Sequence, residues 1–532
     1  MIELNKATTF LSDNTYVCKS DCLDYFNADA KATGGIEFPL IKTAILLQNL
    51  ENVVLDFNGA TLRIHGEIQP FTLIDCKNVT IKNVVVENER SHSTEGVIMP
   101  SLPFRYRIRL NEKFPFNVAD NNLIVYGDGW KNENIYKHPM MFMQFFKKDT
   151  RQATGYMPLI NVGKTAPEYD KKHFYVHHVK AFKKGQDLIL RGGIWMKPQK
   201  AGTHVVLEHE NRKTGTLLAL RCDDLTLQNF RILNGSGMGI MPICCKNVTL
   251  DRLLFCYDQK SHGYVTNAAD GLHSFACSGT MTLKNCIFEG MIDDALNVHG
   301  NYFLVQSAKK DSLFARCASL AFEDKGADET TRYFPLRIGD TISINRAKTL
   351  DKRDEYKILN VIHHENGLAE LLLDRTPVCE VGDLIEDVSA QVDLNIKNCV
   401  FGKANTHLRF QTRGNVIIED CVTELPFFLT GDTTYWFEGS PCVDFTVKNC
   451  RFVGKYAKIN VCPEITPTKD LPYYHKNITI DNCVFDTQFA LQIRLADNVV
   501  FSNNKISGGK KAIITATKCG KINCDNAKLI RT

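Results

Sequence analysis

Three aspartates carry the chemistry that the sequence suggests. Asp293 and Asp294 are adjacent in EGMIDDALNVHGNYF, a segment that otherwise has the apolar pattern of a buried strand, and Asp270 stands 23 residues before Asp293 in TNAADGLHSF. Crowded like charges raise the pKa of at least one member of a group. Carboxyl groups with separated pKa values are what general acid and base catalysis requires, so these aspartates are candidate catalytic residues.

Two other interpretations of the aspartates stay open. An Asp-Asp pair in a turn is often only solvated or capping, and three carboxylates also suit Ca²⁺, which some β-helix polysaccharide lyases use. The apolar surroundings of the three residues, with amide and imidazole neighbours, favour hydrolysis without a metal or other cofactor.

A repeated sequence pattern predicts how the aspartates come together. Each copy has a polar turn, a short alternating strand, a bend with Asn or Asp and a second short strand, as in CDDLTLQNFRI and HKNITIDNCVF. Equivalent bends are 22 residues apart from Asn398 to Asp420 and again from Asn482 to Asn504. Such a period indicates a solenoid, here a right-handed parallel β-helix whose coils stack at about 4.8 Å. Asp270 then lies one coil from Asp293 and Asp294.

Two residue types recur at fixed positions of the repeat and are interpreted as structural. Cysteine follows the bend residue directly, which predicts an inward column of small apolar side chains rather than metal ligands. Asparagine at the bend tolerates left-handed backbone and can form a ladder between coils. The cysteines are Cys286, Cys399, Cys421, Cys450 and Cys483, and the asparagines are Asn83, Asn229, Asn285, Asn398, Asn449 and Asn482.

Two stretches interrupt the repeat with patterns typical of antiparallel hairpins, and we expect each to form a small β-barrel or β-sandwich. The sequence therefore predicts an all-β chain in five parts. They are N-terminal coils over 1–90, a first insertion over 91–215, central coils with the aspartates over 216–302, a second insertion over 303–390 and C-terminal coils over 391–532.

Composition limits the classes of partner. The chain has 532 residues with 64 Lys and Arg against 60 Asp and Glu, and it has no dense basic run, so we expect no nucleic-acid partner. No apolar segment approaches the ~18 residues of a membrane span. The N-terminal residues do not resemble a signal peptide. We expect a cytoplasmic protein, or an exported one whose signal is absent from this sequence.

The motifs resemble those of known glycoside hydrolases. NxxDG, then about 23 residues, then DD on a β-helix is similar to the polygalacturonase type of enzyme. DDALNVHG before an aromatic residue and a barrel-like insertion, with YWFEGSPCVDFTVKNC and INVCPE later, resembles glycoside hydrolase family 110, the exo-α-1,3-galactosidases. The later GHG and RIK motifs of polygalacturonase are missing, and only VHG at 298–300 and Arg494 are similar to them.

The resemblance implies release of terminal α-1,3-linked galactose from a glycan, with inversion and without a covalent intermediate. Asp293 is then the general acid, and Asp270 and Asp294 hold and deprotonate the water. We estimate carboxyl separations of about 6 Å or more from strand spacing, and inverting enzymes typically show about 6.5–9.5 Å.

Six further residues are candidate substrate-binding groups, because amide, imidazole, guanidinium, indole and carboxylate side chains are suited to sugar hydroxyls and C–H faces. Each also has an ordinary structural interpretation, such as a satisfied core histidine or a loop-anchoring aromatic residue. They are Asn297, His299, Arg409, Trp436, Glu438 and Glu464.

Two other functions stay open at this point. One is a different β-helix polysaccharide hydrolase or lyase that acts on uronides, which a site lined with Arg and Lys would favour. The other is a non-catalytic solenoid that binds glycans. A homodimer is also among the expected assemblies, since the insertions could pair two copies.

Overall fold

The computed structural model describes residues 41–127, 178–194, 196–208, 214–257, 263–318, 335–364, 368–402, 407–433, 437–454, 457–464, 473–507 and 511–532, with shorter stretches within 2–25 and 130–161. Nearly all regular structure in this part is strand. Among these residues no helix is long and apolar enough to cross a membrane.

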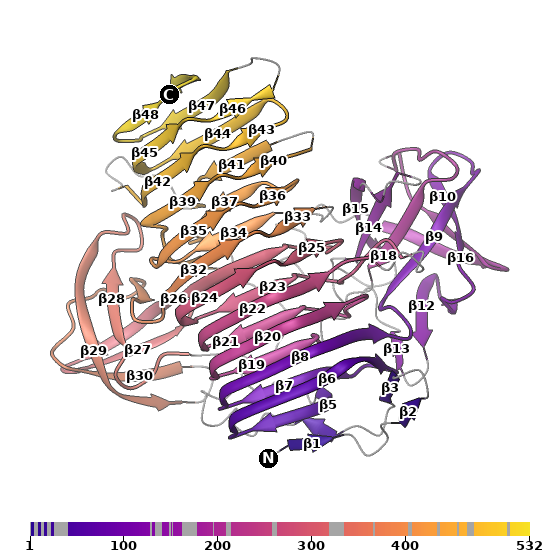
Figure 1. Cartoon of the computed structure of the whole chain (residues 1–532), viewed down its shortest axis with the longest axis horizontal. Helices are drawn as coiled ribbons and strands as arrows, with labels where there is room; N and C mark the ends of the chain where they lie inside the picture. The colour runs from indigo at the N-terminus through magenta and orange to yellow at the C-terminus, as the bar shows by residue number, and fades with distance from the viewer. Residues whose placement is uncertain are drawn as a thin grey trace.

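Two long parallel sheets form the body of the protein, and Figure 1 shows their strands stacked as successive rungs towards the C-terminus. In one sheet β20 (Asp223–Ile232) lies in parallel register between β8 (Lys77–Asn88) and β22 (Lys246–Phe255). Inward side chains along these strands are buried and outward ones are partly exposed. The predicted fold class, a parallel β-helix interrupted by inserted β units, is confirmed.

Stacked side chains of one kind fill the interior of the coils. The rings of Phe255, Phe288 and Phe401 stack at successive centroid distances of 5.4 Å. The predicted cysteine column is also confirmed, since Cys286, Cys399, Cys421, Cys450 and Cys483 are at most 1% exposed. Each coil therefore continues the core of the coil beneath it, as a solenoid requires.

The bends of the repeat have the left-handed backbone that the asparagines predict. Asn229, Asn285, Asn398, Asn449 and Asn482 all have φ between 48° and 57°. The Nδ2 of Asn398 donates to Oδ1 of Asn285 at 2.7 Å, and Asn482 donates to Asn449 at 2.8 Å. Asparagine thus relieves the backbone cost of the bend and links neighbouring coils.

The first insertion leaves the coil register unchanged. β7 (Gln69–Ile74) pairs in parallel with β19 (Leu217–Leu220), although the paired residues are 146 positions apart. A closed barrel with its own apolar core lies between them, to the right in Figure 1. Its strands are β9 (Ser93–Met99), β10 (Arg105–Leu110), β14 (Met141–Phe146), β15 (Ala153–Asn161), β16 (His178–Lys184), β17 (Asp187–Arg191) and β18 (His204–Glu208).

The second insertion grows directly out of a coil strand. β26 (Leu296–Lys309) begins in the β-helix and continues into an antiparallel β unit with a separate core. The other strands of this unit are β27 (Ser312–Cys317), β28 (Thr341–Asn345), β29 (Lys352–His363), β30 (Leu368–Leu373) and β31 (Leu384–Asp387). We keep 91–215 and 303–390 as the proposed limits of the two insertions.

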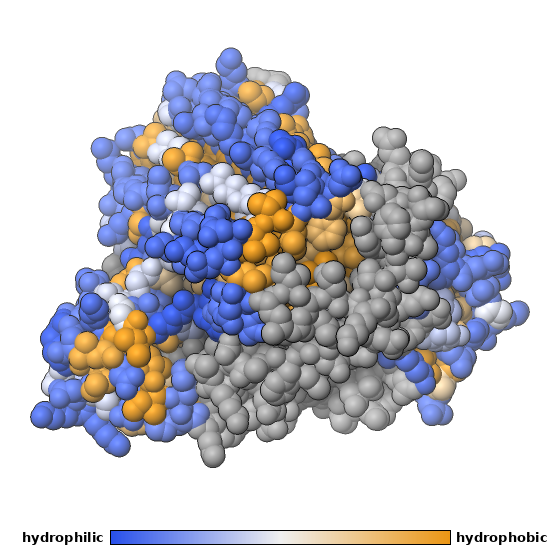
Figure 2. All heavy atoms as spheres, turned by 60° about the horizontal axis from the view of Figure 1, so that its bottom comes forward, coloured by the Kyte–Doolittle hydropathy of each residue, from blue (hydrophilic) through white to orange (hydrophobic). Residues whose placement is uncertain are grey.

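Large apolar side chains are exposed on the second insertion, and Figure 2 shows an orange patch of this kind at the left of the view. They include Leu359 and Ile362 on β29, Leu372 on β30, and Val378 and Val381 in the segment that follows. An exposed apolar patch often marks a contact surface. The homodimer stays a prediction, and this face is where substitutions would test it.

We expect Asn398→Ala to lower the free energy of unfolding by about 1–2 kcal/mol. Alanine is strained in the left-handed backbone conformation of this bend, and it cannot form the side-chain hydrogen bond to Asn285. Asn398→Gly loses the same bond without that backbone cost, so it should be less destabilising. Urea denaturation of both variants measures the difference. Equal destabilisation by both would show that backbone strain is not the reason for asparagine here.

Candidate active site

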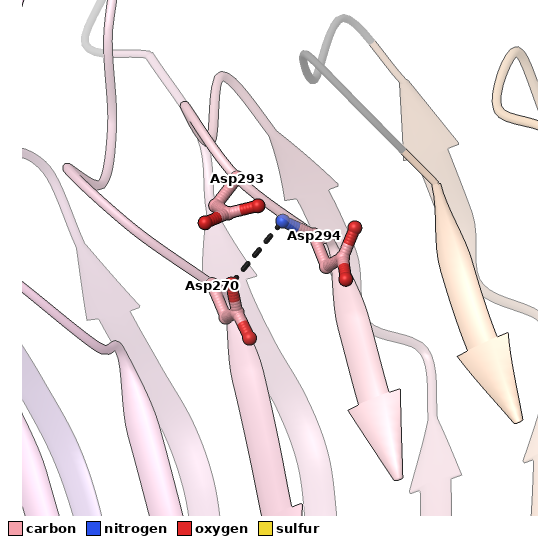
Figure 3. Close-up of side chains that lie close together, drawn as sticks. All are labelled: Asp270, Asp293 and Asp294. Atoms are coloured by element: carbon pink, nitrogen blue, oxygen red, sulfur yellow. Dashed lines mark hydrogen bonds between the residues drawn. The ribbon is translucent and has the colours of Figure 1, made fainter. Parts of the chain in front are cut away.

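Strand register places Asp270 level with Asp294. β23 (Leu272–Phe275) pairs in parallel with β26 so that Leu272 faces Leu296, which makes this coil 24 residues long. Asp270 thus lies one coil from Asp293 and Asp294, as predicted, but a 23-residue coil would have put it level with Asp293, so the expected register was off by one residue. Figure 3 shows Asp270 entering from one segment and Asp293 and Asp294 from the next, with the backbone N–H of Asp294 donating to Oδ1 of Asp270 at 3.3 Å.

The residues of the NAADG motif fix the position of Asp270. Asn267 is fully buried, and its Nδ2 donates to the carbonyl oxygens of Gly237, Ala269 and Asp270 at 2.7–3.1 Å. A Cβ on Gly271 would lie 2.7 Å from the carbonyl oxygen of Ala295, so only glycine allows the two coils to approach this closely. The motif therefore positions the first carboxylate by backbone contacts.

The three carboxylates form one compact cluster. One oxygen of each of Asp270, Asp293 and Asp294 lies within 4.8 Å of the others. Asp270 and Asp294 are buried, while Asp293 is half-buried. Three carboxylate oxygens at this spacing could also hold a hard cation, as the calcium interpretation supposed.

Arg409 is the counterion of the cluster. On β34 (Leu408–Gln411) it lies level with Asn297 of β26, and its Nε is 3.1 Å from Oδ2 of Asp294. Burial lowers the pKa of Arg409, but Asp294 and then Glu438 outweigh it, so the net shift is upward. Arg409 therefore stays charged and offsets one carboxylate of the cluster.

His407 beside this pair is neutral. Its Nε2 accepts a hydrogen bond from Nε of Arg409 at 2.7 Å, and burial followed by the Arg409 charge lowers its pKa to about 3. The 3.4 Å approach of His407 to Asp294 is therefore no ion pair. Sequence reasoning missed His407, although its place two residues before Arg409 was a signal, since strand alternation puts both on one face.

Two histidines are linked in series to Asp270. The Nδ1 of His273 is 2.7 Å from Oδ2 of Asp270, and its Nε2 is 3.1 Å from Nε2 of His299. His273 has the position on β23 that faces Asn297 on β26. His273 had no role assigned from the sequence, and its place three residues after Asp270 was no signal, since strand alternation puts residues three apart on opposite faces.

Glu438 reaches the cluster from a distant part of the chain. β38 (Glu438–Gly439) pairs antiparallel with β26 so that Gly439 faces Gly300, and this brings Oε1 of Glu438 to 3.8 Å from Nε2 of His299. Burial raises the pKa of Glu438, but electrostatic interaction with His299 and then with the charge of Arg409 outweighs burial and lowers the pKa overall. Glu438 is therefore an ionised acceptor, also hydrogen-bonded by the side chain of Asn297.

The structure gathers most of the candidate substrate-binding residues. Asn297, His299, Arg409 and Glu438 lie together around the aspartates. Glu464 is exposed, is bridged through its backbone to Asp432, and acts electrostatically on Arg409. Trp436 lies outside the described residues, so its predicted role stays a prediction.

A compact group of carboxylates with a fixed counterion and an ionised acceptor, on the outward face of a parallel β-helix, has the equipment of a glycoside hydrolase. Curated relatives agree with this class. The chain is 26% identical over 489 residues to "Alpha-1,3-galactosidase B" of Bacteroides thetaiotaomicron, covering 87% of this chain and 75% of that protein. It is also 26% identical to "Alpha-1,3-galactosidase B" of Phocaeicola vulgatus, covering 86% and 77%.

A third relative, "Alpha-1,3-galactosidase A" of Bacteroides fragilis, is 23% identical and covers 88% of this chain and 76% of its own length. These relatives confirm the predicted resemblance to exo-α-1,3-galactosidases and the predicted class of glycoside hydrolase. No protein-family model matches the chain.

Matches among solved structures are weak. "Structure of Yersinia enterocolitica Family 28 Exopolygalacturonase" covers 88% of this chain and 73% of that chain at 9% identity, with a TM-score of 0.24. A structure titled "Glycoside hydrolase" covers 90% and 89% at 7% identity, with a TM-score of 0.19. At these scores the assignment of the fold depends on the strand pairing described above.

We expect Arg409→Met to lower the free energy of unfolding by about 3–5 kcal/mol at pH 7, because it leaves the buried Asp294 carboxylate without its counterion. The loss should shrink as pH falls, since protonation of Asp294 removes the uncompensated charge. Urea denaturation at pH 7 and pH 4.5 measures both effects.

Arg375→Met is the matched control for this experiment, because Arg375 pairs with Asp354 at 3.0 Å on the exposed surface of the second insertion. It should cost less than about 1 kcal/mol. A loss for Arg409→Met that is as small as this, or that does not change with pH, would contradict the role of Arg409 as counterion.

Proposed function

We propose that the protein is an exo-acting glycoside hydrolase that removes terminal α-1,3-linked galactose by an inverting mechanism. The observation that carries the proposal is the cluster of Asp270, Asp293 and Asp294, which come just before the neighbouring parallel strands β23 and β26. The relatives support the substrate, since three that resemble this chain over at least 86% of its length have α-1,3-galactosidase in their names.

In the proposed reaction Asp293 is the general acid. It is the most exposed of the three aspartates and so the best placed to meet a leaving group that must remain in solvent. Water attacks the anomeric carbon while the glycosidic C–O bond breaks. The leaving oxygen takes the proton of Asp293, and Asp270 or Asp294 takes a proton from the water. The products are galactose and the shortened glycan.

The charge of the site supports a neutral sugar as substrate. Glu438 is ionised and can accept hydroxyl protons, while the guanidinium of Arg409 is bound to Asp294 and that of Arg494 donates to the carbonyl oxygen of Pro463. A uronate would bring a further negative charge to this group of carboxylates. The uronide alternative is therefore the weaker one.

Inversion depends mainly on the resemblance and less on the distances. One oxygen of each aspartate lies within 4.8 Å of the others, and this limit on oxygen atoms does not distinguish the carboxyl separations of about 6.5–9.5 Å typical of inverting enzymes from those of about 5–5.5 Å typical of retaining ones. The stereochemistry of the product is therefore the decisive measurement.

We expect proton NMR of the purified protein with Galα1-3Gal to show β-galactose as the first product. Asp293→Asn should lower the rate at least about 100-fold, because the leaving oxygen then has no proton donor. First appearance of α-galactose would replace inversion by retention. An untouched disaccharide in the presence of folded protein would reject the substrate, and binding of the intact glycan would then favour the non-catalytic solenoid.

We expect the activity to survive a metal chelator. If the aspartates work as acid and base, prolonged treatment with EDTA followed by desalting should leave the rate of galactose release unchanged within about twofold. Loss of activity that added Ca²⁺ restores would instead favour the calcium interpretation of the cluster.

A further inference from the structure

A chain of hydrogen bonds runs from the catalytic cluster into the protein, and the proposed hydrolysis does not explain it. The Nδ1 of His299 lies 3.0 Å from the carbonyl oxygen of Gly300, its Nε2 lies 3.1 Å from Nε2 of His273, and Nδ1 of His273 lies 2.7 Å from Oδ2 of Asp270. The two rings meet nearly at right angles with centroids 4.9 Å apart. Each nitrogen of both rings is thus engaged.

The hydrogen-bond partners determine where most of the protons lie. A carbonyl oxygen only accepts, so Nδ1 of His299 carries a proton. Burial lowers the pKa of His299 more than the nearby Glu438 raises it, which favours a neutral ring with a lone pair on Nε2. The Nε2 of His273 must then donate to it. One further proton has to lie between Nδ1 of His273 and Oδ2 of Asp270.

The surroundings place that proton on the histidine. Oδ1 of Asp270 accepts the backbone N–H of Asp294, which favours the carboxylate form of Asp270. Among the described residues, the other charged and titratable groups near His273 include His299 on β26, Glu438 on β38 and the cluster with its counterion Arg409. Met241 and Asn297 lie level with His273 on the neighbouring strands. Carboxylates dominate this set, and they favour an imidazolium.

We propose that His273 is a positively charged positioning residue, held by neutral His299, that keeps Asp270 ionised and oriented as a base. His273 and the backbone of Asp294 bind different oxygens of Asp270, so the carboxylate is fixed at both. In this arrangement His299 acts through His273. This role of His299 differs from the contact with the sugar that the sequence led us to expect. The kinetic consequence of the proposal rests on the proposed hydrolysis, and the protonation state does not.

The protonation states can be read directly by ¹⁵N NMR of the full chain labelled at histidine, without substrate at pH 7. We expect both ring nitrogens of His273 to be protonated and His299 to be neutral with its proton on Nδ1. The variants His273→Gln and His299→Gln identify the two sets of signals by their loss. A neutral His273, or a His299 with its proton on Nε2, would overturn the proposal.

Kinetics test the consequence for Asp270. Loss of the positive charge in His273→Gln should move the acidic limb of the pH profile of kcat/KM to higher pH, by about one pH unit. It should lower kcat about tenfold at pH 5 and change KM little, because His273 acts on Asp270 rather than on the sugar. His299→Gln should shift the limb in the same direction by less. An unchanged acidic limb in an active His273→Gln enzyme would refute the positioning role.

His364→Gln is the matched control, since His364 lies 3.4 Å from Glu370 on the second insertion, far along the chain from the cluster. It should leave the pH profile unchanged. If His273→Gln does not fold, the signals of His273 in the unsubstituted protein and in His299→Gln still decide the protonation state. A protein that cleaves no galactoside yet has a charged His273 would reject the hydrolysis and keep this inference.

Discussion

The site depends on the fixed register between neighbouring parallel coils. Backbone hydrogen bonds allow a strand to shift against its neighbour only in whole residues, and a shift of one residue would turn every side chain to the opposite face. Because Leu272 is held level with Leu296 and Leu296 with Leu408, residues from three coils meet on the same outward face. Both insertions lie between coils whose registers they leave intact, so the site forms although its residues are far apart in the sequence.

Charge balance is the second requirement of this arrangement. Four carboxylates lie near one another and would repel, namely those of the three aspartates and Glu438. Arg409 contacts Asp294 and His273 contacts Asp270, so these two carboxylates each have a specific partner. Asp293 is the more exposed member of the cluster. The aspartates thus have unequal surroundings although they share one residue type, and unequal surroundings are what separates an acid from a base.

Sequence reasoning predicted the parts of this protein that depend on repetition. The inward cysteines and the left-handed asparagines recur at one position per coil, so their spacing alone indicated where they lie. The same reasoning gave the wrong length for the coil between β23 and β26, which has 24 residues rather than 23. One extra residue changes the register without changing the sequence pattern. His407 was overlooked and His273 was left without a role, because a single histidine has no periodicity to mark it.

Contacts between distant segments were harder still to predict. Glu438 was proposed from its neighbours in a motif, but its approach to His299 follows from the antiparallel pairing of Gly300 with Gly439, which no local pattern shows. Pairings of this kind are determined by the tertiary arrangement of loops, so they can be found only in the folded chain.

One strand, β26, belongs to both the β-helix and the second insertion. Its first residues lie beside the aspartates and its last residues lie in the sheet of the insertion, with Asn297 and His299 near one end and Lys309 at the other. A continuous strand resists stretching and bending far more than a loop does. The insertion is therefore continuous with the rung that carries Asn297 and His299, and a movement of the insertion would act on this rung through a strand rather than through a loop.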